Sequence, residues 1–264
     1  MKIINSFPYE LSSEDIRFKV KDDNKYILNL KEDSEVYVSV FIEGDNTENV
    51  SLEINVNKYS TLNLVLFTLN VKSYVLNINL YESSVLNLTT TDSINSDSTV
   101  DKNINILGRN SNVSVYEFIS SRNSDVKKGT SNLNHFAKDS TSNGTFMYLS
   151  KDTSYITRDV VSNVIEGMVN STSTENIKGV LLGDYARIDA KPILKIALDD
   201  VHVSHGCAIG TIDSNEVYYL MSRGLTREDA LKMICFSLIS PVLKAPKNDE
   251  FRELIRGYLE EEIK

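Results

Sequence analysis

The chain contains 264 residues, of which 41% are hydrophobic, 25% are charged and 8% are aromatic, and its formal net charge at pH 7 is -9. This length is sufficient for one large domain with its own core, or for one domain with an appendage. The negative charge argues against binding to the phosphate backbone of nucleic acids, because proteins of that class usually carry a basic face. Lys127-Lys128 is about the longest basic run, so we expect no nucleic-acid partner.

The sequence also argues against membrane and disulfide-rich classes of protein. No apolar run approaches the roughly 18 residues that a membrane span needs. Two cysteines, Cys207 and Cys235, are too few for a disulfide framework. Residues 1–8 contain no apolar stretch of the length that a signal peptide needs. We therefore expect a cytoplasmic protein without a membrane partner.

The first 25 residues have a mixed pattern. Residues 12–15 are suited to capping a short helix, whereas residues 17–21 alternate like a strand. We treat residues 1–25 as an N-terminal segment without an assigned structure.

From Tyr26 to about Ser121, apolar residues alternate with polar ones. Alternation with period two is typical of half-buried β-strands. The apolar positions include Leu52, Ile54 and Val56; Leu62, Leu64 and Leu66; Leu76, Ile78 and Leu80; Leu86 and Leu88; Ile104 and Ile106; and Val113 and Val115. The intervening residue is often Asn, as at positions 55, 63, 77, 79, 87 and 105. The strand character continues to Leu198, and we predict a β core over residues 26–210.

Two all-β architectures agree with this pattern. A β-sandwich needs hairpins, which usually contain Asn-Gly or Asp-Gly pairs, and this region contains neither pair. A loose internal repeat is present instead, at residues 60–64, 74–78 and 84–88. Short strands joined by polar corners, with similar residues returning in each coil, are typical of a β-helix. The repeat is irregular, so the pattern favours the β-helix only modestly.

After Gly210 the apolar periodicity becomes helical. Asp213 or Ser214 is suited to capping a helix that ends at Gly224. The segment Thr226-Arg227-Glu228-Asp229 resembles a capping box, and the helix behind it is predicted to end before Pro241. A last helix is predicted over residues 250–262. Residues 211–264 are thus predicted to form a small helical domain.

The densest group of chemically active residues lies in residues 199–210. It contains His202, His205 and Cys207. Positions i and i+2 of a strand share a face, so His205 and Cys207 are predicted to lie on one side and His202 on the other. Iron–sulfur clusters bind thiolate and sometimes imidazole, whereas a buried corner histidine and a small buried cysteine would explain the same residues structurally. The pattern by itself favours the structural interpretation.

Several ordered motifs in the same half of the chain resemble one family. They are Leu181-Leu182-Gly183-Asp184, the run of residues 190–196, the run of residues 199–206 and Tyr219-Leu220-Met221-Ser222-Arg223-Gly224. Together with residues 134–143 they are similar to the C-terminal core of the SufB/SufD family, over about residues 131–244. The resemblance implies a right-handed parallel β-helix followed by a small C-terminal α-helical domain. It also implies a scaffold subunit for iron–sulfur cluster assembly, and not an enzyme.

Within the family the motifs are more similar to the SufD branch. Ala186 occupies the position that matches a cluster-related thiol of SufB, and Gly206 follows His205 where SufB has Glu. The chain departs from familiar members in lacking their long N-terminal helical region and in having Cys207 directly after the glycine. The resemblance therefore leaves open a heterodimer with a SufB/SufD-like partner or a homodimer.

The resemblance also implies particular site residues. His205 and Cys207 are expected to be metal or cluster-related ligands for an iron–sulfur cluster that is held transiently and shared with a second subunit. The helices are expected to bind a SufC-like ABC ATPase through Tyr219, Met221, Arg223, Leu231 and Ile234. The chain contains no GxxxxGK[ST] pattern, so we expect the ATPase and not this chain to bind the nucleotide.

We interpret His135 as a structural corner residue and Cys235 as part of a helix core. A β-helix can also be a carbohydrate-active enzyme, which needs paired carboxylates, but Asp199-Asp200 is the only candidate pair in the motif region and adjacent strand residues point to opposite faces. A passive β-helical binding or structural protein is the remaining alternative.

Overall fold

The computed structural model describes residues 2–3, 9–20, 24–47, 49–92, 94 and 96–263. The strands in these ranges are β1 Lys2–Ile3, β2 Tyr9–Glu10, β3 Glu14–Lys19, β4 Lys25–Leu30, β5 Glu35–Thr47, β6 Val50–Val56, β7 Thr61–Val71, β8 Ser73–Leu80, β9 Val85–Thr91, β10 Ser98–Ile106, β11 Asn112–Ser121, β12 Val126–His135, β13 Thr141–Lys151, β14 Tyr155–Val164, β15 Ser171–Leu182, β16 Arg187–Ile196 and β17 Val201–Thr211. The helices are α1 Ser214–Met221, α2 Arg227–Lys244 and α3 Asp249–Ile263.

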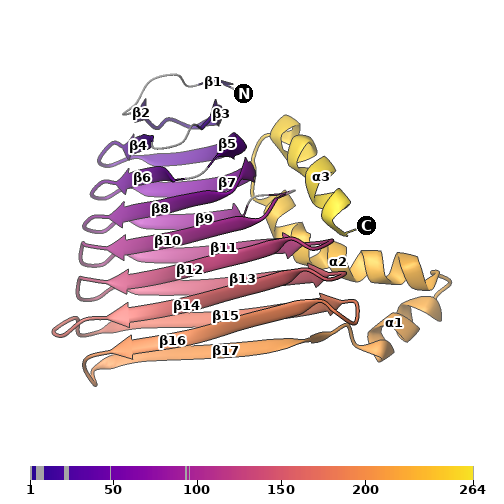
Figure 1. The fold of residues 1–264 in the computed structure, drawn as a ribbon. Helices are drawn as coiled ribbons and strands as arrows, with labels where there is room; N and C mark the ends of the chain where they lie inside the picture. The colour runs from indigo at the N-terminus through magenta and orange to yellow at the C-terminus, as the bar shows by residue number, and fades with distance from the viewer. Residues whose placement is uncertain are drawn as a thin grey trace.

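The strands form two stacked parallel sheets. In the described residues the odd-numbered strands make a nine-stranded sheet from β1 to β17, and the even-numbered strands make an eight-stranded sheet from β2 to β16. Each coil of the chain contributes one strand to each sheet, and Figure 1 shows the coils stacked from β1 to β17. The mainly β fold with a parallel β-helix and a helical C-terminal region is therefore confirmed. The hairpin-connected sandwich is excluded because neighbouring strands in both sheets are parallel and belong to successive coils, whereas a hairpin joins antiparallel neighbours.

Six successive corners contain a non-glycine residue in the left-handed backbone conformation. They lie between β4 and β5 and so on to β14 and β15, and the residues with positive φ are Asp33, Tyr59, Ser83, Asn110, Asp139 and Asn170, with Gly167 as a second one in the last of these corners. The amide of Ser83 donates to the carbonyl of Arg109 in the next coil at 2.8 Å, and Asn170 donates to Asp200 in the same way at 3.0 Å. Because each corner bonds to the following one, polar corner residues replace the glycine turns of hairpins.

Asparagines form a ladder on the outer face of the even-numbered sheet. Each side-chain amide donates to the side-chain oxygen of the preceding coil, from Asn55 to Asn29 at 2.9 Å, Asn79 to Asn55 at 2.9 Å, Asn105 to Asn79 at 3.0 Å, Asn134 to Asn105 at 3.0 Å and Asn163 to Asn134 at 3.3 Å. Such ladders need identical residues in register in successive coils. The recurring Asn of the sequence therefore marks the stacking of the coils.

The N-terminal segment begins the β-helix. Residues 12–15 do not start a helix, because β3 begins at Glu14 and pairs in parallel with β5. Of the strand-like residues 17–21, the first three belong to β3. Residues 1, 4–8 and 21–23 of this segment lie outside the described residues.

The helices begin as the sequence predicts, but one of them extends further. Asp213 caps α1 and Thr226 caps α2, where its hydroxyl accepts from the Asp229 amide at 3.1 Å. The prediction that α2 ends before Pro241 is wrong, because the helix continues through this proline to Lys244. Val242 and Leu243 are buried there, and burying two such side chains stabilises by about 3 to 6 kcal/mol, enough to offset the roughly 3 kcal/mol cost of an internal proline.

Helices α2 and α3 pack against the outer face of the odd-numbered sheet. One apolar cluster joins Phe41, Phe67 and Phe118 of the strands to Leu238 of α2 and Ile255 of α3. Cys235 belongs to the same cluster, which confirms it as a core residue. Figure 1 shows α2 and α3 beside the upper and middle coils, with α1 beyond them. None of the described helices combines the length and the apolar character that crossing a bilayer requires.

Candidate functional site at the open end of the β-helix

The last coil of the β-helix has no further strand beyond it. Within the described residues β16 ends the even-numbered sheet and β17 ends the odd-numbered sheet, and they form the lower edge of the molecule in Figure 1. Apolar side chains of this coil are exposed in consequence, with Leu194 at 36% and Ile209 at 38% relative exposure. The interior of the β-helix therefore opens to solvent at this end.

The register of β17 places His205 and Cys207 on the same side. Their partners in the preceding coil are Glu175 and Ile177, which are both buried in the interior. In-register parallel strands keep equivalent side chains on one face, so the imidazole and the thiol lie on the interior side of the open coil. His202 pairs with Thr172 and lies on the outer side.

The donor set at this end is incomplete. His205 and Cys207 are both exposed, and the Sγ atom of Cys207 lies 3.9 Å from the carbonyl oxygen of Ala190. Partial burial raises the pKa of the Cys207 thiol above its ordinary value. The described residues contain no group of three or more His, Cys, Asp or Glu side chains arranged for a metal ion. Among the described residues of β17, His205 and Cys207 are therefore two possible donors on one side, whereas iron–sulfur clusters are usually bound by four.

A chain of buried polar side chains leads up to this coil. Both ring nitrogens of His135 are hydrogen-bonded, Nδ1 to Ser140 at 2.7 Å and Nε2 to Ser142 at 2.8 Å. From Ser142 the contacts continue to Ser173 at 2.8 Å and then to Ser162 at 2.6 Å. They end where the Ser162 hydroxyl donates to Glu175 Oε1 at 2.5 Å.

Burial moves the pKa of both titratable ends of this chain toward the neutral form. It lowers the pKa of His135 to about 4 and raises the pKa of Glu175 to about 7. The structural interpretation of His135 is confirmed by its two serine partners. Sequence reasoning missed Glu175, although serines and this glutamate occupy alternate positions from Ser171 to Glu175, where apolar residues would be expected in an interior-facing strand.

A second buried polar group lies in the middle coils. Lys102 Nζ lies 2.5 Å from Asp92 and 2.7 Å from Glu117, and Arg158 lies 2.5 Å from the other oxygen of Asp92. All four side chains are at most 2% exposed. Gly129 makes room for the guanidinium, because a Cβ atom there would lie 2.3 Å from Arg158 Nη1. The four charges cancel, so we regard the group as internal structure and not as a binding site.

The predicted ATPase-binding residues divide into an exposed and a buried set. Tyr219 and Met221 of α1 are 55% and 41% exposed, and the Arg223 guanidinium lies 4.9 Å from the centre of the Tyr219 ring. Leu231 is partly buried in α2. Ile234 is buried with Val217 and Ala230 between the helices, so it supports the surface from inside.

Exposed residues extend this helical surface. Tyr218 is 73% exposed and Met233 is 55% exposed, and neither was predicted. A groove of about 660 Å³ runs between α1, α2 and the end of β15, with Met221 and Leu231 in its lining. The helical end of the molecule thus presents aromatic and methionine side chains to solvent, as surfaces that bind other proteins often do.

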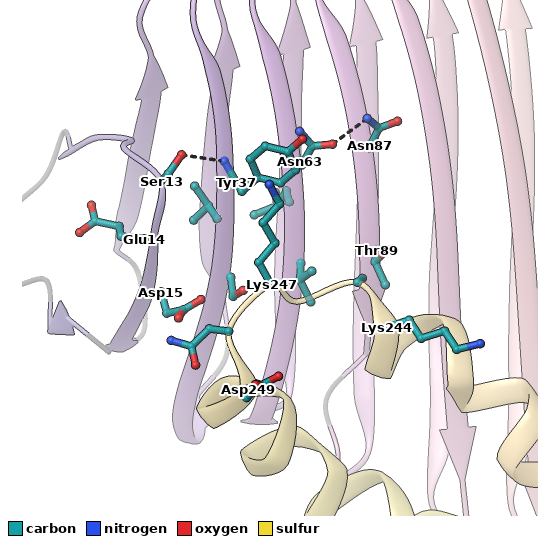
Figure 2. A pocket seen from close by; sticks show the side chains of 16 residues that line it. Ser13, Glu14, Asp15, Tyr37, Asn63, Asn87, Thr89, Lys244, Lys247 and Asp249 are labelled. Atoms are coloured by element: carbon teal, nitrogen blue, oxygen red, sulfur yellow. Dashed lines mark hydrogen bonds between the residues drawn. The ribbon is translucent and has the colours of Figure 1, made fainter.

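A larger groove lies elsewhere, on the outer face of the first coils. It has a volume of about 1130 Å³ and lies between the odd-numbered sheet and the loop from α2 to α3 (Figure 2). Lys247 Nζ sits 3.0 Å from the centre of the Tyr37 ring, and Glu14 and Asp15 add acidic groups to the lining. Its described lining contains neither imidazole nor thiol, so it does not supply the donors that a cluster needs. Asp199 and Asp200, the candidate glycosidase pair, lie instead in an exposed corner.

These features define a parallel β-helical protein whose open last coil carries an imidazole and a thiol. Comparison with known families gives a match over residues 21–238 to the SufBD core domain of the SUF system for FeS cluster assembly. The match covers more than half of the chain, and the chain therefore belongs to the SufBD family, as the sequence motifs indicated.

Individual relatives match over shorter segments. The chain is 31% identical over 93 residues to the iron-sulfur cluster assembly protein SufD of Escherichia coli, covering 35% of this chain and 22% of the relative. It is 26% identical over 143 residues to SufD of Bacillus subtilis, covering 54% of this chain and 33% of the relative. A SufBD family protein of Pyrococcus horikoshii is 43% identical over 65 residues, which are 25% of this chain and 15% of the relative.

Proposed function

We propose that this protein is a SufD-like scaffold subunit for iron–sulfur cluster assembly. The observation that carries the proposal is the open last coil, in which His205 and Cys207 share the interior side at the edge of both sheets. Imidazole and thiolate are ligands that iron accepts. The cluster is the cargo of this site and is held transiently. Both cysteines are free thiols, in keeping with work in a reducing compartment such as the cytoplasm.

A second SufB/SufD-type subunit is proposed to complete the site. Two donors are too few for a cluster, and the free edges of β16 and β17 offer unpaired backbone groups that a partner strand can bond. The exposed Leu194 and Ile209 lie at the same end and would be buried by such a partner. A partner of the same family can supply the missing donors, whether it is a second copy of this chain or a different subunit.

The helical end is proposed to bind a SufC-like ABC ATPase. Tyr219, Met221 and Arg223 form its exposed part, with Leu231 at the edge of the adjacent groove. The chain has no P-loop pattern, so the nucleotide is assigned to the ATPase. In this arrangement the subunit is a scaffold and not an enzyme.

The cluster proposal is tested by anaerobic co-expression with the ATPase and with a SufB-type subunit. Iron, sulfide and subunit stoichiometry are measured on the purified complex. His205→Ala is expected to lower the iron and sulfide content severalfold with the fold unchanged, because it removes the one imidazole on the interior side of β17. His202→Ala is the matched control, since His202 lies on the same strand but on the outer side. Equal iron and sulfide in the two variants would contradict the assignment.

The ATPase proposal is tested by a charge change on α1. The double variant Tyr219→Asp, Met221→Asp is expected to lose co-purification of the ATPase, because two carboxylates replace apolar contact area. Tyr59→Asp is the control, since Tyr59 is 58% exposed and lies in a corner of the β-helix with positive φ that Asp accepts. Undiminished co-purification with the α1 variant would remove the helical end as the binding surface.

A further inference from the structure

Glu175 is a buried residue, and one of its two carboxylate oxygens has no hydrogen-bond partner among the described residues. The residue is fully buried on the interior side of β15, and its Oε1 atom accepts from Ser162 at 2.5 Å. Its Oε2 atom is also buried, and it has no hydrogen-bond partner among the described residues. A buried carboxylate oxygen without a partner is costly, typically by about 1 to 3 kcal/mol or more, and native structures rarely contain one without a reason.

Along the stack Glu175 has a neighbour in the coil on either side. Its partner in the preceding coil is Gly144, which has no side chain, and a Cβ atom at that position would lie 2.4 Å from the ring of Phe146. The opposite sheet supplies Ser162, which already bonds the first carboxylate oxygen. The partner of Glu175 in the following coil, which is the last one, is His205.

Glu175 and His205 are direct neighbours in the parallel ladder, on the same side. Parallel strands lie about 4.8 Å apart, a separation that a carboxylate and an imidazole span easily with ordinary rotamers. The His205 ring is exposed on its far side, where β17 ends the sheet. Its ring can therefore turn one nitrogen toward the carboxyl group and leave the other directed out of the open coil.

We propose that Glu175 is a positioning residue for His205. Its free oxygen accepts a hydrogen bond from one ring N–H, which fixes the tautomer and leaves the other nitrogen unprotonated toward a metal or cluster. Carboxylate partners of this kind orient metal-binding histidines in many proteins. The proposal rests on the proposed function for the identity of what His205 binds, but the hydrogen bond itself does not depend on it.

The buried serines explain why the carboxyl group is held so firmly. Ser162 and Ser173 connect Glu175 to Ser142 and His135, so four hydroxyl and imidazole contacts of 2.5 to 2.8 Å fix the chain across successive coils. A ligand histidine at an open end benefits from a partner held by hydrogen bonds in the interior. The position of Glu175 one coil below the surface meets this requirement.

The test is the tautomeric state of His205, read from the ring ¹⁵N chemical shifts of histidine-labelled full-length protein. The chain contains three histidines, and His202→Gln and His135→Gln variants assign the signals. In the wild type we expect one dominant His205 tautomer. In Glu175→Leu, which keeps the side-chain volume but removes the acceptor, we expect the His205 shifts to move to the mixed-tautomer values of a free imidazole.

Two comparisons make the outcome decisive. Glu175→Gln retains a carbonyl acceptor and is expected to restore the wild-type His205 shifts, whereas a merely structural loss would not be rescued in this way. His202 is the internal control, because its partner Thr172 lies on the outer side and its shifts should not change. Identical His205 shifts in the wild type and Glu175→Leu would overturn the proposal. If Glu175→Leu fails to fold, the His205 shifts of Glu175→Ala, which removes the acceptor without placing a large apolar side chain beside the buried serines, decide in its place: unchanged His205 shifts overturn the proposal and mixed-tautomer shifts support it.

The same measurement separates this proposal from the function on which it rests. The shifts are recorded without partner, ATPase or cluster. A His205 tautomer that depends on Glu175, combined with normal cluster content in the His205→Ala complex, would leave the positioning intact and remove the scaffold role. The reverse pair of results would remove the positioning role alone.

Discussion

The early and the late coils of the β-helix have the same backbone but different interiors, because the late coils add buried charged and polar side chains to the apolar core. In the coils from β4 to β9 the interior columns are apolar, for example Leu28, Ile54 and Ile78 in successive even strands. From β10 to β15 the same kind of position also holds Lys102, His135, Arg158 and Glu175, all buried. The outer ladders and the corners continue unchanged across the boundary. The backbone of the coil is therefore the same over an apolar and over a polar interior.

The two interiors differ in how much a single change can cost. An apolar column loses contact area when one residue is shortened, and its neighbours keep their own contacts. A buried polar group depends on partners in other coils, so one substitution leaves charges or hydroxyls without a partner. We infer that the apolar early coils contribute most of the free energy of folding. This stability compensates for the cost of burying polar residues in the coils next to the open end.

The strongest test of this contrast is Arg158→Met. It keeps most of the apolar stem but removes the guanidinium beside Asp92 and near Glu117. The expected loss in the free energy of unfolding is about 3 to 5 kcal/mol, the usual cost of breaking a buried ion pair on one side. Urea unfolding followed by circular dichroism measures it.

Arg109→Met provides the matched control. Arg109 also bonds an aspartate, Asp139, at 2.6 Å, but its side chain is 65% exposed. The expected loss there is about 1 kcal/mol or less. Similar losses in the two variants would show that the buried group contributes no more than a surface pair, and the contrast between early and late coils would not hold.

The sequence predicted the early coils better than the late ones for a physical reason. Leu52, Ile54 and Val56 alternate without interruption, and alternation directly reports an apolar interior. In β10, Lys102 stands between the inward positions of Val100 and Ile104, and alternation alone does not distinguish a buried charge from a break in the strand. The partners of Lys102 lie in the corner after β9 and in β11, and only the register of the coils brings them together.

The candidate site shows the same limit. The rule that positions i and i+2 share a face was enough to place His205 with Cys207 and apart from His202, and it needs only the local strand. Glu175 could not be singled out, since its relation to His205 depends on the pairing of β15 with β17. The exposed Tyr218 and the buried Ile234 were missed because a helical stripe does not reveal which of its edges a neighbouring helix covers.

A pH titration of stability tests the later polar chain. Burial lowers the pKa of His135 to about 4, and an unfolded histidine titrates near 6.5. Between these values the unfolded state binds more protons, so this contribution is fully present above pH 6.5 and is lost as pH falls toward 4. The expected loss from His135 is about 3 kcal/mol. Burial raises the pKa of Glu175 to about 7, which acts in the opposite direction over this pH range, so the His135 contribution is measured as the difference in the free energy of unfolding in urea between the wild type and a variant without the histidine.

The variant His135→Gln isolates this contribution, because its amide can bond both serines but does not titrate. The difference in stability between the wild type and the variant should shrink as pH falls from 6.5 to 4. His202→Gln, on the outer side of β17, should follow the wild-type curve. A pH-independent difference for His135→Gln would mean that the histidine is not held neutral by its surroundings.

The smallest expected effect concerns what the two regions share. Asn55 lies in the outer ladder over the apolar coils and Asn134 lies in the same ladder over the polar coils, each bonded to an asparagine above and below. Replacing either by Ala should cost about 1 kcal/mol, the net value of the hydrogen bonds removed from a partly exposed site. Because the ladder is continuous, the two losses, measured by urea unfolding, should agree within about 0.5 kcal/mol. A clearly larger loss at Asn134 would show that the polar interior weakens the outer face of its own coils, and that the backbone scaffold is not independent of what it encloses.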